Sequence, residues 1–182
     1  MNTVMIILRI IHILSGVFWV GFAFFNIVFL QPTIKATGAE GQKTFQYLMR
    51  QTRLMTTVYI AATLTTLTGI LQYGYVSHLQ SAFLASGWGM VLTVGSVSGI
   101  IAWFLAIFSI RSLFNRIGHV GQEIQASNGA PAPELVSKMA GLVSKLGHVG
   151  NVALVFMVIS TIGMAAARYS ILLQHQVRSE AA

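Results

Sequence analysis

Four apolar stretches dominate the sequence and restrict what the chain can fold into. They lie near residues 4–30, 54–76, 88–113 and 147–172. Each is at least as long as the roughly 20 residues that a helix needs to cross a bilayer. Because an unpaired backbone group is too costly in lipid, each stretch is expected to be helical. The pattern predicts one domain over residues 1–182, an all-α integral membrane four-helix bundle.

The composition supports the bilayer as the surroundings of most of the chain. Hydrophobic residues make up 55% of the sequence and charged residues 8%, with no aspartate at all. A soluble domain carries about 25% charged residues, so this chain could not cover a water-exposed surface. The first apolar stretch is too long for the core of a signal peptide and lacks a basic leader, so it is expected to remain as a span.

The basic residues lie mainly between the apolar stretches. One connector holds Lys35, Lys43, Arg50 and Arg53, and the other holds Arg111, Arg116, Lys138 and Lys145. The net charge of +7 is therefore spread over loops, which favours a topological role and argues against a nucleic-acid partner. The positive-inside rule predicts a bacterial inner-membrane protein with two amphipathic cytoplasmic connectors and both termini outside. Pro32 is expected to end the first helix.

The first span carries a stripe of polar, small and aromatic residues at helical spacing. Its members are Arg9, His12, Gly16, Trp19, Ala23 and Asn26. Polar groups within a span face the interior of a bundle, so this stripe is expected to be the buried face. Its small residues would let a neighbouring helix or a flat ligand approach closely.

The role of His12 has two interpretations. The residue lies roughly 7 Å to the outer side of the midplane, at 1.5 Å per residue from a centre near residue 17. In the first interpretation, its neutral imidazole hydrogen-bonds another helix and Arg9 reaches the headgroups. In the second, His12 is an axial ligand of a b-type haem, Arg9 and Arg168 bind the propionates, and Trp19 and Tyr73 contribute aromatic surface.

The remaining histidines are weaker candidates. His78, in the uncharged loop 74–89, would reach His12 only if that loop folds over the bundle, and His148 lies on the inner side, too deep to share one iron with His12. His119 and His148 occupy the matching segments "IGHVG" and "LGHVG", which suggest either helix packing or a second metal. The absence of cysteine excludes thiolate metal sites and covalent c-type haem.

Small residues and methionines raise two further alternatives. Gly95 with Gly99, and Gly163 with Ala167, form pairs at four-residue spacing that favour close helix packing, within the chain, in a homodimer or in a larger membrane complex. The segments "TLTGILQYGY" and "STIGMAAARYS" resemble each other weakly, as an internal duplication would. Eight methionines, with Met5, Met90 and Met164 toward the outer half, allow copper(I) as a minority alternative.

The first span, "LRIIHILSGVFWVGFAFFNIVFLQP", resembles a superfamily of small bacterial membrane proteins. Its members include CopD-like copper-resistance domains, HemJ-type protoporphyrinogen oxidases and uncharacterised integral membrane families. The resemblance rests on His12, Ser15, Gly16, Trp19 and Gly21 in the first span. It extends to the Thr68–Gly69 pair that ends the second.

The resemblance implies a four-helix bundle whose first-helix histidine binds haem or metal. HemJ-type enzymes also need a lysine in the third helix, and none occurs in residues 88–110. The leading hypothesis is a haem-b-binding membrane protein for electron transfer or haem and porphyrin handling, with oxidoreductase activity left open. The alternative is a non-catalytic accessory subunit of a membrane complex, or a copper-handling membrane protein.

Overall fold

The computed structural model describes residues 3–78, 80–127 and 132–180, without the side chains of Ala39, Arg50 and residues 168–180. All described elements are helical. In chain order they are α1 (Thr3–Phe25), the π-helical segment η1 (Asn26–Leu30), α2 (Gln31–Gln51), α3 (Leu54–Ser77), α4 (Ser81–Ala85), α5 (Gly87–Phe104), the π-helical segment η2 (Leu105–Ile110), α6 (Arg111–Ala126) and α7 (Pro133–Glu180).

The described residues contain four helices that are long and apolar enough to cross a membrane. These are Thr3–Gly38, Leu54–Ser77, Gly87–Ala126 and Pro133–Ala167. Their outward faces carry large apolar side chains such as Leu14, 66% exposed, and Val17, 68% exposed. Such faces are unusual in a soluble protein and suit contact with lipid tails. The predicted all-α fold with four apolar helices is confirmed.

The first span does not end at Pro32, so that prediction is wrong. The helix passes through Pro32 and turns only at Gly38, whose φ of 58° lies in the left-handed region that glycine tolerates. The π-helical segment η1 ends at Leu30, two residues before the proline. A proline removes one backbone donor, and a local change of helical pitch re-accommodates the hydrogen bonds that this disturbs.

The second connector contains the amphipathic helix α6, and the described residues show no further separate helix between α6 and the fourth span. Instead, α7 is a single helix of 48 residues, about 72 Å long at 1.5 Å per residue. Its first turns pack against α6 through Leu113, Val120 and Leu142. The connector therefore forms a two-helix extension of the bundle, and the helix of the fourth span begins at Pro133 rather than near residue 147.

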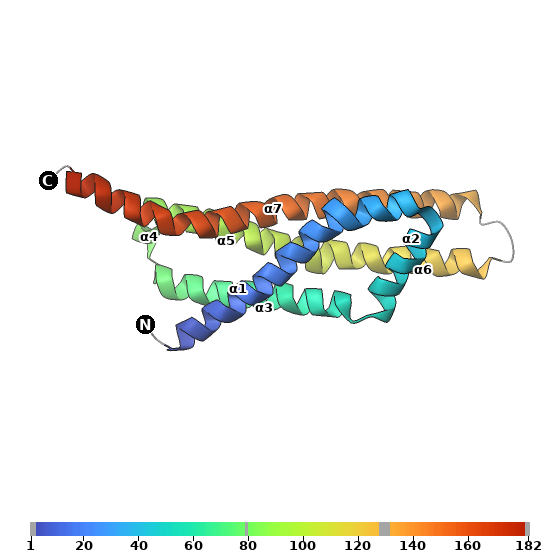
Figure 1. Cartoon of the computed structure of the whole chain (residues 1–182), viewed down its shortest axis with the longest axis horizontal. Coiled ribbons are helices and arrows are strands. Elements are labelled where there is room, and N and C mark those ends of the chain that lie inside the picture. The colour runs from blue at the N-terminus through green and yellow to red at the C-terminus, as the bar shows by residue number, and fades with distance from the viewer. Residues whose placement is uncertain (1–2, 79, 128–131, 181–182) are drawn as a thin grey trace.

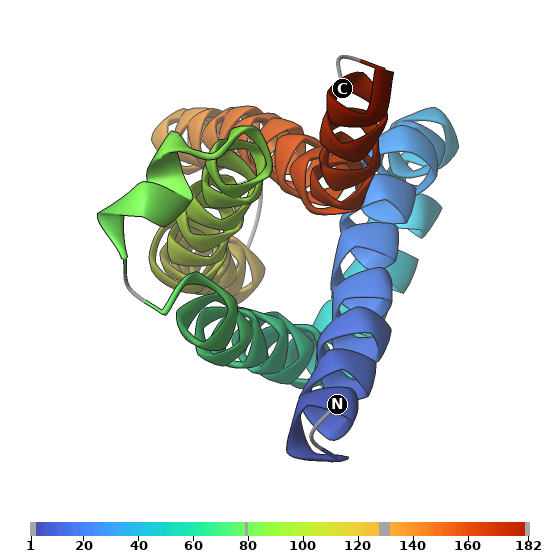
Figure 2. The same ribbon diagram turned by 90° about the vertical axis from the view of Figure 1, so that its left-hand side faces the viewer.

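The bundle consists of two helix pairs. Figure 2 looks along the bundle and shows α1 beside α3, and α5 beside α7, which are also the two pairs that share most contacts. The N- and C-terminal ends and α4 lie at one end of the molecule, and α2 and α6 lie at the other (Figure 1). Both basic connectors therefore share one end.

The α5–α7 pair is held together by glycines. A Cβ atom on Gly163 would lie 2.9 Å from Cα of Gly95, and one on Gly95 would lie 3.2 Å from the Ser160 carbonyl oxygen. Only glycine lets two helix backbones approach this closely. The prediction that these small residues form a packing face is confirmed, and the face is used within the chain.

The two pairs have the same sequence of parts. Each begins with a membrane helix that continues through a π-helical segment into an amphipathic helix, and each ends with a long apolar helix. Gly69 of α3 faces α1, just as Gly163 of α7 faces α5. Opposite these two glycines stand His12 and Gly95, at nearly the same distance from the start of their helices. A histidine therefore replaces the glycine contact in the first pair.

The main core lies midway along the bundle and is built from small residues. Around Trp19 and Met157 it contains Val58, Ala61, Ala62, Ala102 and Ala106. Trp19 is 4% exposed and Ala23 packs against the same cluster. The predicted buried stripe of the first span is confirmed in part: Trp19 is buried, Arg9 is exposed, and the other members are half-buried.

Candidate functional site

The imidazole of His12 joins α1 to α3. Its Nδ1 lies 2.8 Å from the backbone carbonyl oxygen of Thr65 and 3.3 Å from Oγ1 of Thr68. A carbonyl oxygen can only accept a hydrogen bond, so Nδ1 must carry the proton. In the neutral ring this leaves Nε2 unprotonated, with a lone pair free to bind a proton, a hydrogen-bond donor or a metal.

The surroundings of His12 fit the ring closely. A Cβ atom on Gly69 would lie 2.9 Å from Cε1 of the imidazole, so only glycine leaves room at that position. Ser15 accepts a hydrogen bond from Oγ1 of Thr65 at 2.8 Å, one turn along α1. Gln72 donates to the carbonyl oxygen of Leu8 at 3.4 Å. These contacts fix α1 against α3 and hold the half-buried ring in one orientation.

Of the two arginines of the predicted site, the structure describes the side chain of Arg9 only. Arg9 lies one turn from His12 toward the N-terminal end of α1 and is exposed. A long exposed side chain at this level can reach either lipid headgroups or an anionic group of a ligand beside His12. Arg168 belongs to α7, but its side chain lies outside the described residues.

Tyr73 takes part in a different group of side chains. Its hydroxyl lies 2.7 Å from Oγ1 of Thr93, and its ring packs edge-on against Phe83 with 5.7 Å between the centroids. Phe83 comes from α4 and packs in turn against Trp88, 4.7 Å away. This aromatic cluster lies where α3 ends and α5 begins, so the contacts of Tyr73 link those helices.

The other predicted metal ligands do not gather around His12. The loop after α3 packs Phe83 of α4 against Tyr73 and Trp88, but His78 stays exposed with its ring 6.2 Å from that of Tyr75. His119 and His148 lie on α6 and α7 and are both exposed. Among the described residues, no group of three or more His, Cys, Asp or Glu could hold a metal ion.

The methionines considered for copper are dispersed over three helices. Met5 is on α1, Met90 on α5 is 57% exposed, and Met164 on α7 packs against Gly99. Three other methionines, Met49, Met55 and Met157, line one cavity.

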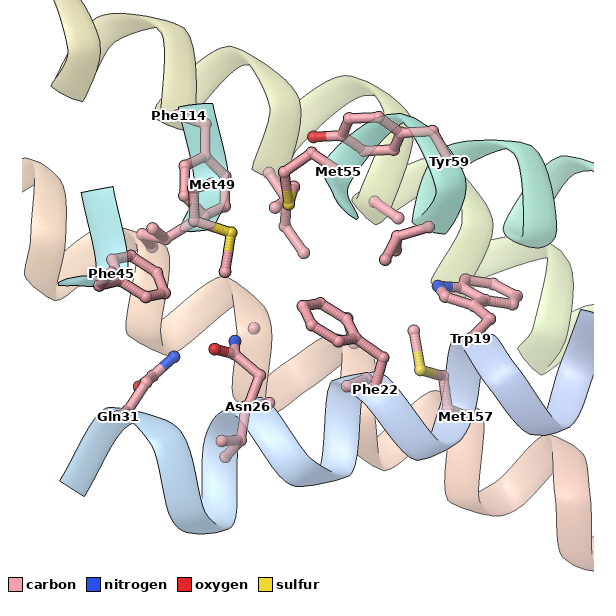
Figure 3. Close-up of a pocket in the computed structure, with 18 residues that line it drawn as sticks. Trp19, Phe22, Asn26, Gln31, Phe45, Met49, Met55, Tyr59, Phe114 and Met157 are labelled. Atoms are coloured by element: carbon pink, nitrogen blue, oxygen red, sulfur yellow. The ribbon is translucent and has the colours of Figure 1, made fainter. Parts of the chain in front are cut away.

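A cavity of about 90 Å³ lies toward the end of the bundle that carries α2 and α6. The two π-helical segments line it, together with residues of α1, α2, α3, α6 and α7. Trp19, which the sequence analysis grouped with His12, lines this cavity instead. It is about 10 Å from His12 along α1, at 1.5 Å per residue. Figure 3 shows aromatic rings, thioethers and two amides around the cavity.

Asn26 is the polar residue of this cavity that sequence reasoning did not assign to a site. Its Oδ1 is buried without a hydrogen-bond partner in the described structure, and the amide points into the cavity (Figure 3). An unsatisfied buried acceptor costs about 1–3 kcal/mol. The sequence signal was a lone asparagine near the C-terminal end of the first apolar stretch. The burial of its Oδ1 and the cavity beside it depend on the packing of the neighbouring helices, which the sequence alone does not show.

The cavity near Asn26 does not suit a porphyrin. Sites for ligands of drug size have volumes of about 300–1,000 Å³, and this one measures about 90 Å³. A haem bound through His12 would instead lie beside the N-terminal half of α1 and the C-terminal half of α3, with one histidine ligand from the described residues. The donor chemistry at His12 fits such a group at one axial position.

Comparisons with protein-family models, with characterised proteins and with solved structures found no match for this chain.

Proposed function

We propose that this chain is a multi-pass inner-membrane protein that binds haem b through Nε2 of His12 and serves electron transfer or haem handling. One observation carries the proposal: Nδ1 of His12 donates to the Thr65 carbonyl oxygen at 2.8 Å. Metal-binding histidines almost always donate their other ring nitrogen to a carbonyl or carboxylate, which fixes the tautomer and makes the free nitrogen more basic.

The residues around His12 have defined parts in this proposal. Nε2 of His12 would hold the haem iron, and Arg9 with Arg168 would pair with the propionates near the outer surface. Gly69 admits the ring and so sets its orientation. The bound group would supply reversible one-electron chemistry, while the chain supplies the ligand, the anchoring charges and an apolar environment that tunes the potential.

A haem titration tests this proposal. Haemin is added to the cofactor-free protein in detergent, and the Soret band is followed for the parent chain, His12→Ala and the control His119→Ala. His119 is exposed on α6, so its loss removes an imidazole without touching the site. We expect one haem per chain in the parent and the control, and no saturable binding in His12→Ala. Equal binding by all three would refute ligation by His12.

A second function is favoured by the exposure of α1. In the most apolar part of the first span 6% of residues are buried inside the chain, against 22%, 22% and 17% in the other three. A helix so little covered by its own chain suits a non-catalytic subunit whose first span packs against a partner, with His12 only joining α1 to α3. Light scattering in mild detergent tests this, because such a subunit is extracted in a complex well above its own 19.7 kDa.

A further inference from the structure

We propose that the cavity near Asn26 is a second binding site, which takes one small neutral aromatic ring bearing a hydroxyl group, of the phenol or hydroquinone class. The site is separate from His12 and does not depend on haem binding. Its features are an unpartnered amide, an aromatic and thioether lining, the absence of charge, and two π-helical segments.

The polar groups define what the ligand must offer. Oδ1 of Asn26 is a buried acceptor without a partner, so it requires a hydrogen-bond donor. The indole nitrogen of Trp19 and the hydroxyl of Tyr59 also face the cavity (Figure 3). A hydroxyl group on the ligand meets the requirement of Asn26, because its O–H donates to Oδ1. None of the described residues that line the cavity is charged, which favours a neutral ligand.

The apolar part of the lining selects a ring. Phe22, Phe45 and Phe114 lie around the cavity, and their rings favour edge-to-face or offset contact with another aromatic group. Met49, Met55 and Met157 also line it, and thioethers make favourable contacts with aromatic rings. An aliphatic alcohol would satisfy Asn26 but would gain nothing from these contacts.

The volume limits the ligand to a single ring. An engineered apolar cavity of about 150 Å³ holds benzene, and this one is about 90 Å³. Methionine side chains have three rotatable bonds and adapt to what they contact, so the three thioethers can move to admit the ring. A ligand with two fused rings would require the helices to separate.

The backbone around the cavity is also unusual. Asn26 and Ile27 come from η1, and Ala106 and Ile110 come from η2, so both π-helical segments of the described chain border the same cavity. Such segments are rare in proteins and are frequent at functional sites. They occupy matching positions in the two halves of the bundle, and only the first half contributes a polar side chain from this segment to the cavity.

Binding of 4-fluorophenol, followed by ¹⁹F NMR on the detergent-purified full chain, tests the proposal. Fluorobenzene serves as the matched ring without a hydroxyl. We expect saturable binding of 4-fluorophenol, roughly tenfold tighter than fluorobenzene, as one hydrogen bond of about 1.4 kcal/mol provides. Asn26→Leu should abolish this preference, whereas Asn115→Leu, an exposed asparagine on α6, should retain it.

Four results would overturn the proposal. Signals of both probes that change linearly with concentration and never saturate would mean partition into the detergent only. If Asn26→Leu prefers 4-fluorophenol over fluorobenzene as strongly as the parent chain does, the site lies elsewhere. Saturable binding that survives in Ala106→Leu, which fills the cavity from η2 and keeps the amide, would do the same. If neither probe binds, the cavity holds water only. None of these readouts involves haem, so failure here leaves the proposal for His12 untouched.

Discussion

At His12, one hydrogen bond decides which ring nitrogen is available for chemistry. Nδ1–H of His12 donates to the Thr65 carbonyl oxygen, with 2.8 Å between nitrogen and oxygen, and leaves Nε2 without a proton. The contact with Gly69 keeps the ring in this position. The same contacts serve an interhelical link and a cofactor ligand, so residue-scale experiments must separate ring position from helix packing.

Replacement of Gly69 by alanine should displace the imidazole. The added Cβ would lie 2.9 Å from Cε1 of His12. We expect Gly69→Ala to destabilise the chain by about 1–3 kcal/mol and to lower the haem content per chain. The control is Gly74→Ala on the same helix, where nothing lies within 4 Å of the added Cβ. Identical Soret-to-protein ratios in both variants would contradict the role assigned to Gly69.

Removal of the Asn26 amide should stabilise the ligand-free protein. Its buried Oδ1 has no partner in the described structure, and an apolar group of similar size removes that penalty. We expect Asn26→Leu to raise the free energy of unfolding by about 1–3 kcal/mol in a detergent-denaturant titration. Asn115→Leu, exposed on α6, should change it little. A loss of stability in Asn26→Leu would mean that the amide has a bonding partner in the folded protein.

At the scale of the helices, the two pairs are joined differently. Gly95 and Gly163 bring α5 and α7 into backbone contact, whereas an imidazole stands between α1 and α3. The π-helical segments follow the first helix of each pair and lead into the amphipathic helices. Close backbone packing thus holds α5 against α7, whereas the imidazole of His12 joins α1 to α3.

The glycine crossing provides a test of the α5–α7 pair. We expect Gly163→Ala to destabilise the protein by about 1–3 kcal/mol, because its Cβ would meet Cα of Gly95 at 2.9 Å and backbone atoms cannot move aside cheaply. Gly141→Ala, in the same helix with nothing within 4 Å, should be neutral or gain up to about 1 kcal/mol from helix propensity. Thermal unfolding of both variants compares them, and equal stability would argue against the crossing.

Much of this could be predicted from the sequence, but only where a pattern within one helix carried the information. The four spans and the buried face of the first followed from apolar length and from the spacing of His12, Trp19 and Asn26. The continuation of the helix through Pro32 could not be predicted in this way, because it depends on a π-helical segment that accommodates the backbone N–H missing at the proline. The distribution of Trp19 and Tyr73 into separate clusters also could not be predicted, since it depends on how α3, α5 and α7 pack.

At the scale of the whole molecule, both ends of the chain and α4 share one end of the bundle, opposite the basic connectors (Figure 1). The positive-inside rule predicts that the connectors face the cytoplasm. Because the chain has no cysteine, single cysteines introduced for labelling report without background. In intact spheroplasts we expect a membrane-impermeant maleimide to label Ser81→Cys on α4 but not Ser127→Cys after α6. The reverse pattern would invert the topology.

The absorption spectrum of the protein purified in detergent, as isolated and after reduction with dithionite, tests whether the chain binds haem b through His12. We expect a Soret band that shifts on reduction and is lost in His12→Ala, with a band shape of five-coordinate haem if no second ligand is supplied. A colourless protein after expression with ample haem, or an identical spectrum in His12→Ala, would contradict it.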